Sequence, residues 1–286
     1  MRDSPPKSQS PDATCARSGP GNALCEYGLA ELDAAIDSLG QRGNEIHAGV
    51  HHARKALRRT RAMLALGAPA LGPGARFLDR ALREVNHRLS PLRDAHALVE
   101  TLDRLHTKAR DDATREALDH ARRSASRRRA AMAHQSEFTR ELQRAHAIVT
   151  TLRAALTGSP WETISPSVVA DAMAAAEQKA ASACERACKR DDAEAWHRWR
   201  RRMRRISQQH RALVAAGVPV NADEFDKNLT EQLGVLQDLN LLVAHCGKDS
   251  PFSTCRSTLR RFAKRTLAKQ RKRIRSVVTL AAKGAA

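Results

Sequence analysis

Residues 50–67 read VHHARKALRRTRAMLALG, and this stretch decides how the chain folds. Ala, Leu, Met and Arg are strong helix formers, so the stretch predicts a helix. At about 100° per residue, its cations fall within an arc of roughly 160°, and its apolar residues occupy the opposite side. The cationic side consists of His51, Arg54, Lys55, Arg58, Arg59 and Arg61. One face therefore belongs to a core, and the other carries cations alone.

A second stretch, WHRWRRRMRRISQQHRAL at 196–213, repeats this arrangement. Both stretches match H-x-x-R-[KR]-x-x-R-R without a gap, although the apolar residues differ. The matched cations of the second copy are His197, Arg200, Arg201, Arg204 and Arg205. Further along, LSPLRD at 89–94 matches LGVLQD at 233–238. The two matches, in the same order, predict an internal duplication.

A looser pattern, R-R-x-x-x-R, follows in each half of the chain. Its residues are Arg122, Arg123 and Arg127 in the first half, and Arg260, Arg261 and Arg265, with Lys264, in the second. With the earlier matches, this pattern favours a duplicated four-helix unit. We include these residues among the candidate anion-binding positions.

The rest of the sequence is helical in character, with sparse glycine and proline. Breaks are predicted near 40–44, 67–75, 108–112, 157–166, 189–192, 217–223 and 247–251, which gives eight helices. Residues 1–21 are rich in Pro, Ser and Gly and are predicted to be a disordered tail. The prediction is an all-α fold of two pseudo-symmetric four-helix bundles, residues 22–160 and 161–286.

The charge balance points to an anionic partner. The chain has 50 Lys and Arg against 31 Asp and Glu, a net charge of +19. An ordinary solvated helix face mixes charge signs, because like charges at i±4 destabilise a helix. Arginine binds phosphoryl oxygens with two parallel hydrogen bonds, and rows of arginine over several turns suit a polymer of phosphates. Only nine residues are aromatic, few for stacking the bases of a single strand.

Other functional classes lack support in the sequence. No apolar run is long enough to cross a membrane, and the start does not resemble a secretory signal, so we expect a cytoplasmic protein. The six cysteines are interpreted as small buried thiols, and the remaining histidines as surface or core residues. No motif for a phosphate-binding glycine loop, a catalytic zinc site or a nucleophile elbow is present, so neither a cofactor nor catalysis is predicted.

The doubled H-x-x-R-[KR]-x-x-R-R motif with L-x-x-L-[RQ]-D resembles the conserved histidine α-helical domain, CHAD, over about residues 22–283. The resemblance implies two four-helix bundles related by a pseudo-two-fold axis, with basic surfaces facing a shared groove. It also implies binding of inorganic polyphosphate and association with polyphosphate granules. Residue by residue, it assigns polyphosphate contact to His51, Arg54, Lys55, Arg58, Arg59, His197, Arg200, Arg201, Arg204 and Arg205.

The sequence departs from the family pattern at two positions, and two alternative functions stay open. Gln237 stands where the first copy has Arg93, and Pro91 should kink the third helix or shift its start. Asp94 and Asp238 are interpreted as structural groups that orient arginines of a neighbouring helix. The alternative functions are a nucleic-acid-binding protein that uses the same cations and an enzyme that acts on polyphosphate or nucleotides with an external metal.

Overall fold

The computed structural model describes residues 19–133, 136–219, 227–247 and 250–284, and all regular structure in these ranges is helical. The predicted all-α class is confirmed. Most of the predicted tail, residues 1–18, lies outside the described residues. The α-helices are α1 (Pro20–Gly40), α2 (Ile46–Arg88), α3 (Ser90–His106), α4 (Asp112–Ala133), α5 (Ser136–Thr157), α6 (Pro166–Arg190), α7 (Ala193–Ala215), α8 (Lys227–His245) and α9 (Arg256–Gly284). Single 3-10 turns occupy Gly43–Glu45 and Trp161–Thr163.

Helix ends lie beside the predicted breaks, and local capping explains two of them. Ser165 accepts a hydrogen bond from the Val168 amide at 3.3 Å and starts α6. Asp192 accepts from the Ala195 amide at 2.7 Å and starts α7. Such side-chain oxygens satisfy amides that have no partner in the first helical turn. The sequence predicted one helix over 112–157, but the described residues form two, α4 and α5. No glycine or proline marks that break.

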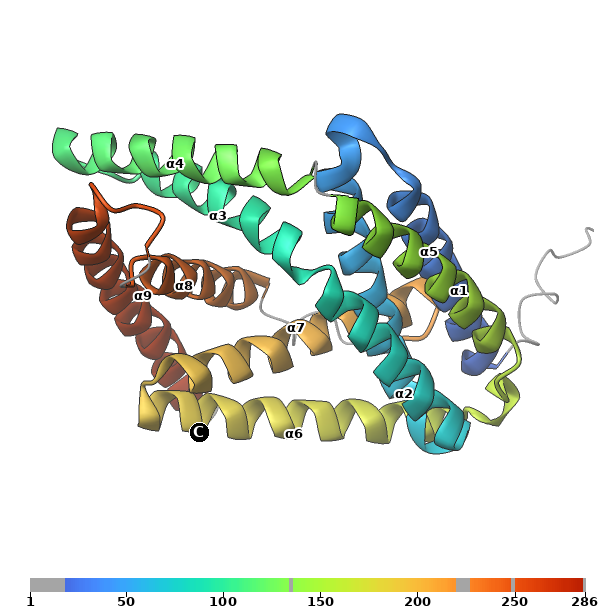
Figure 1. Cartoon of the computed structure of the whole chain (residues 1–286). Coiled ribbons are helices and arrows are strands. Elements are labelled where there is room, and N and C mark those ends of the chain that lie inside the picture. The colour runs from blue at the N-terminus through green and yellow to red at the C-terminus, as the bar shows by residue number, and fades with distance from the viewer. Residues whose placement is uncertain (1–18, 134–135, 220–226, 248–249, 285–286) are drawn as a thin grey trace, which may run out of the picture.

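The helix α2 is a hairpin of two arms, 46–71 and 73–88, that reverses at Gly72. Gly72 has φ 66° and ψ −147°, a conformation available almost only to glycine. The arms run antiparallel, since the Asn86 side chain donates to the Arg54 carbonyl at 2.9 Å. The break predicted at 67–75 is therefore a tight reversal, seen where the ribbon turns at the lower end of α2 in Figure 1.

Pro91 separates the second arm of α2 from α3. It lies in the first turn of α3, where a missing amide is tolerated, and only Leu89 stands between the two helices. The expectation that Pro91 shifts the start of a helix is confirmed. This junction places Arg93 and Asp94 in the first two turns of α3, beside α2.

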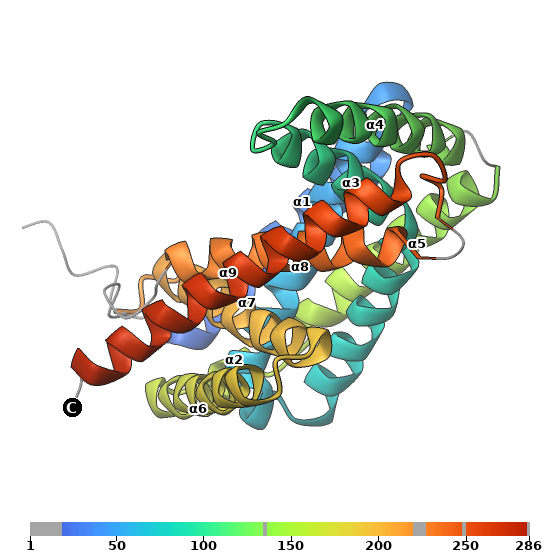
Figure 2. The ribbon, with the colours of Figure 1, turned by 90° about the vertical axis from the view of Figure 1, so that its left-hand side faces the viewer.

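Three hydrophobic clusters hold the helices together. The first joins α1, both arms of α2 and α5 with the ends of α6 and α7, and the third contains residues of α6, α7, α8 and α9. The second cluster combines α3 and α4 with α8 and α9, which also lie together in Figure 2. The predicted boundary between residues 160 and 161 thus separates helices that share a core.

The helices that carry matching motifs pack against each other: α2 on α7, α3 on α8 and α4 on α9. A two-fold relation between the halves of the chain would produce such pairs. The internal duplication itself stays a prediction. Among the described helices, none is long and apolar enough to cross a bilayer.

We predict that Gly72→Ala destabilises the protein by about 1–3 kcal/mol, because a side chain is strained at this φ and ψ. Gly74 is the matched control, since a Cβ there meets no atom within 4 Å and its φ is not positive. Gly74→Ala should be neutral or stabilise by up to about 1 kcal/mol. Urea denaturation measures both variants. Equal effects of the two substitutions would contradict the proposed strain.

Candidate functional site

Five arginines from three helices form one group, which we name the central cluster: Arg54 and Arg58 of α2, Arg93 of α3, and Arg200 and Arg204 of α7. Their charges act on one another: Arg58 is affected by all four of the others, and Arg204 by Arg200, Arg93 and Arg54. All five side chains are partly buried. The packing of α2 on α7 therefore brings the two matched basic faces together, as the sequence suggested.

Few acidic groups balance the central cluster. Among the residues that the structure describes, Arg58, Arg200 and Arg204 have no ion pair with a carboxylate. The buried Nε atom of Arg58 also lacks a hydrogen-bond partner. Arg54 donates to the Ser90 hydroxyl at 2.8 Å and, through a close contact, to the Asn86 carbonyl. The cluster is held in place by neutral groups and by packing, and it retains excess positive charge.

Burial and mutual repulsion lower the pKa values of four of these arginines, Arg54, Arg58, Arg200 and Arg204. Burial, followed by the charges of Arg204, Arg54, Arg93 and Arg200, lowers the pKa of Arg58 to about 8. Burial, followed by Arg200, lowers the pKa of Arg204 to about 10. An anion bound among the guanidinium groups would favour their charged forms. The site is thus electrostatically prepared for a ligand with several negative charges.

Two aspartates form ion pairs with arginines at the edge of the central cluster. Asp238 of α8 accepts from Arg104 of α3 at 2.8 Å, and this pair joins the two halves of the chain. Asp238 thus contacts an arginine of a neighbouring helix, as its predicted structural role requires, although its partner, Arg104, was not among the candidate residues. Asp94 contacts its neighbour Arg93 at 3.3 Å and favours the charged form of Arg54. No spacing in the sequence singles out Arg104, because its partner lies on a helix from the other half.

The two motif histidines lie beside the cluster in different settings. His197 Nδ1 lies 2.7 Å from the side-chain oxygen of Gln237, and burial lowers the pKa of His197. His51 is close enough to Arg58 and Arg93 for both to lower its pKa, after burial. Its ring also lies 6.3 Å from that of His96. Gln237, which replaces Arg93 in the second copy, therefore orients a histidine through a neutral contact.

A histidine group that the sequence did not predict surrounds His51. The rings of His47 and His96 stack at 6.2 Å, and Arg129 Nη1 of α4 lies 3.3 Å from His96 Nδ1. Burial, followed by Arg129 and His96, lowers the pKa of His47 to about 4. Sequence spacing missed this group because its members come from three separate helices.

The remaining predicted residues of α2 and α7 lie on the flanks. Arg59 is bound by Glu31 of α1 at 3.0 Å, and Arg61 by Asp79 of the second α2 arm at 2.9 Å. Lys55 and Arg201 are exposed, and Arg201 lies 3.6 Å from Glu194. Arg205 donates to the Arg61 carbonyl at 3.5 Å. The structure thus divides the continuous row of cations into a central part and two sides.

The predicted residues of α4 and α9 lie apart from the central cluster in their contacts. Arg122 pairs with Asp103 of α3. The others are exposed, and the contacts of the described residues link none of them to the central arginines: Arg123, Arg127, Arg260, Arg261, Lys264 and Arg265. A role for these residues in the same site stays a prediction.

Comparison with known proteins agrees with the fold. The CHAD domain family matches residues 27–247. A solved structure, PptA from Streptomyces chartreusis, is similar with a TM-score of 0.59 and 16% sequence identity, covering 91% of this chain and 100% of that one. At this identity the likeness shows the shared fold alone. No curated protein matches the sequence.

Adjacent arginines of α2 should respond to the same substitution with opposite signs. Arg58→Met removes a partly buried, unpaired charge and should stabilise the ligand-free protein by about 1 kcal/mol. Arg59→Met leaves Glu31, 11% exposed, without its cation and should destabilise by about 1–3 kcal/mol. Urea denaturation at low salt measures both. A loss of stability in Arg58→Met would contradict the unpaired state of this guanidinium.

Stability should fall as the pH drops from 7 to 5. The pKa of His47 is about 4 in the folded protein against 6.5 when unperturbed, and the pKa values of His51 and His197 are also lowered. The unfolded chain therefore binds more protons in this window, and protonation favours unfolding. Denaturation at pH 7, 6 and 5 measures the slope, and His47→Gln should reduce it. An unchanged slope in that variant would exclude His47 as a source.

Proposed function

Because this chain belongs to the CHAD family, we propose that it binds inorganic polyphosphate in the central cluster without transforming it. One observation carries the proposal: the cluster gathers five guanidinium groups from three helices, of which three have no acidic partner among the described residues. Such a group is stabilised by a ligand with closely spaced negative charges. A linear phosphate polymer supplies one charge or more at every unit along its length.

The tryptophan residues argue against single-stranded nucleic acid as the partner. All three tryptophans, Trp161, Trp196 and Trp199, are buried in the hydrophobic clusters. Recognition of single strands generally uses exposed rings on which bases stack. The central cluster offers charge and planar hydrogen-bond donors instead. A ligand that consists of phosphate alone uses all of these features and requires no others.

The carboxylates beside the cluster support binding in place of catalysis. Asp238 is occupied by Arg104, and Asp94 lies against Arg93. A general base must lie within hydrogen-bond reach of the proton that it abstracts, and the contacts of these two carboxylates are with arginines. We therefore assign both aspartates a positioning role. On this proposal the protein holds the polymer and associates with polyphosphate granules in the cytoplasm.

The decisive variant is the double substitution Arg58→Met and Arg204→Met. It removes two central guanidinium groups from opposite helices, and each charged contact contributes roughly 1.5–3 kcal/mol. We expect affinity for polyphosphate of defined length to fall at least about 100-fold at near-physiological salt. The matched control is Arg140→Met with Arg144→Met, which removes the same charge from exposed positions of α5. The control should stay within about threefold of wild type.

Competition identifies the class of partner. Labelled polyphosphate is displaced by duplex DNA, single-stranded RNA or heparin at fixed salt, and circular dichroism verifies that the variants are folded. We expect unlabelled polyphosphate to compete far better than the other polyanions. Equal competition by DNA would favour the nucleic-acid alternative, since duplex binding also rests on phosphate contacts. Equal losses in the α5 control would show that total charge, and not the central cluster, determines affinity.

A further inference from the structure

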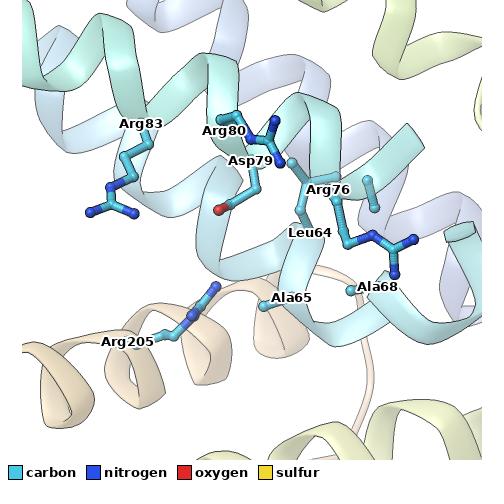
Figure 3. A pocket seen from close by; sticks show the side chains of 9 residues that line it. Leu64, Ala65, Ala68, Arg76, Asp79, Arg80, Arg83 and Arg205 are labelled. Carbon is cyan, nitrogen blue, oxygen red and sulfur yellow. The ribbon is translucent and has the colours of Figure 1, made fainter. Parts of the chain in front are cut away.

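A pocket of about 310 Å³ lies between the two arms of α2 and the adjacent face of α7 (Figure 3). Its apolar side consists of Leu64, Ala65, Ala68 and Ala75. Its polar side consists of Arg76, Asp79, Arg80 and Arg83 of the second α2 arm and Arg205 of α7. The pocket therefore combines a surface of small apolar side chains with a rim of four guanidinium groups.

The one carboxylate of the rim does not neutralise these arginines. Asp79 is bound at both oxygens by Arg61, at 2.9 and 3.2 Å. Within the described part of the chain, Arg76, Arg80, Arg83 and Arg205 have no ion pair with an acidic side chain. In Figure 3, Arg205 points toward the second arm of α2, where the other rim residues lie. The pocket thus has a surplus of positive charge of its own.

Arg205 differs in this respect from its counterpart in the first copy of the motif. Arg59 occupies the matching position and is paired with Glu31 at 3.0 Å. Arg205 contacts a carbonyl at 3.5 Å and has no ion pair among the described residues; burial lowers its pKa, and the charge of Asp79, which is itself bound by Arg61, opposes this shift. A partly buried guanidinium with so weak a partner is unfavourable unless a ligand accepts from it. The asymmetry therefore points to an anion at Arg205.

The apolar surface narrows the chemical class of that anion. Polyphosphate has no apolar part, so the apolar side of the pocket would gain nothing from it. The accessible part of that side consists of the partly exposed Ala65 and Ala68, and Leu64 and Ala75, at 1% and 2% exposed, belong to the core beneath them. Pockets for small molecules typically begin at about 300 Å³ and combine apolar walls with a few polar groups. A molecule with a flat ring and attached phosphates fits this lining, because the ring can lie against the small side chains while the phosphates reach the arginines of the rim.

We propose that this pocket binds a nucleoside polyphosphate, with the base against Ala65 and Ala68 and the phosphates at Arg76, Arg80 and Arg205. The site is distinct from the central cluster, because Arg204 and Arg205 lie about 100° apart around α7 and face different neighbours. The inference does not depend on the proposed binding of polyphosphate, and either can fail without the other.

Calorimetric titration of the full-length Arg58→Met, Arg204→Met protein, in which the central cluster has lost two guanidinium groups, with ATP, adenosine and inorganic triphosphate tests the proposal. ATP should bind at least tenfold more tightly than either of the others, since only ATP uses both the apolar surface and the rim. In this protein, the further substitution Arg205→Met should weaken ATP binding at least tenfold, whereas Arg140→Met on α5 should change it less than about twofold. Triphosphate binding as tight as that of ATP, or no ATP binding, would overturn the proposal.

A second variant separates the ring from the phosphates. Ala65→Leu fills the apolar side of the pocket at a partly exposed helical position and leaves every arginine in place. It should weaken ATP binding at least fivefold and leave triphosphate binding unchanged. Parallel losses for both ligands would mean that no ring lies on this surface, and ATP binding to the wild-type protein that disappears in the Arg58→Met, Arg204→Met protein would place ATP in the central cluster.

Discussion

Burial of the apolar faces of α2 and α7 forces like charges together, and the rest of the site depends on this constraint. Leu57 and Trp199 are 0% and 2% exposed, so each helix contributes large apolar groups to the core. Each such group stabilises the fold by about 1.5–3 kcal/mol. The cationic faces cannot turn away without exposing these residues. Repulsion among the arginines is therefore imposed by packing.

The fold class and the cationic faces could be predicted because both depend on local sequence. Helical periodicity separates Ala53 and Leu57 from Arg54 and Arg58, and capping residues such as Asp192 mark helix starts. The partner of each cation could not be predicted. Arg58 and Arg59 are neighbours in the sequence, yet one is unpaired and the other is bound by Glu31. Only the packing of α1 on α2 decides between them.

The two halves of the chain share a motif, but the surroundings of the motif differ between them. Arg93 adds charge to the central cluster from the first half, whereas Gln237 at the matching position holds His197 through a neutral hydrogen bond. A second arginine at Gln237 would add repulsion next to Arg200 and Arg204. The substitution therefore limits the charge that the fold must tolerate. The matching positions Arg59 and Arg205 also differ. Arg59 is paired with Glu31, whereas Arg205 contacts a backbone carbonyl.

If the central cluster binds a polyanion as proposed, binding would affect the rigidity of the interface between the halves. Arg58 and Arg204 come from opposite halves, and the Arg104–Asp238 pair joins α3 to α8 across the same boundary. Without a ligand, repulsion between Arg58 and Arg204 opposes this brace. A polyanion bound to both guanidinium groups would replace their repulsion by attraction. It would then strengthen the contact between the halves together with the Arg104–Asp238 pair. Since a ligand stabilises the state to which it binds, the contact between α2 and α7 is the part of the fold on which an anion acts most directly.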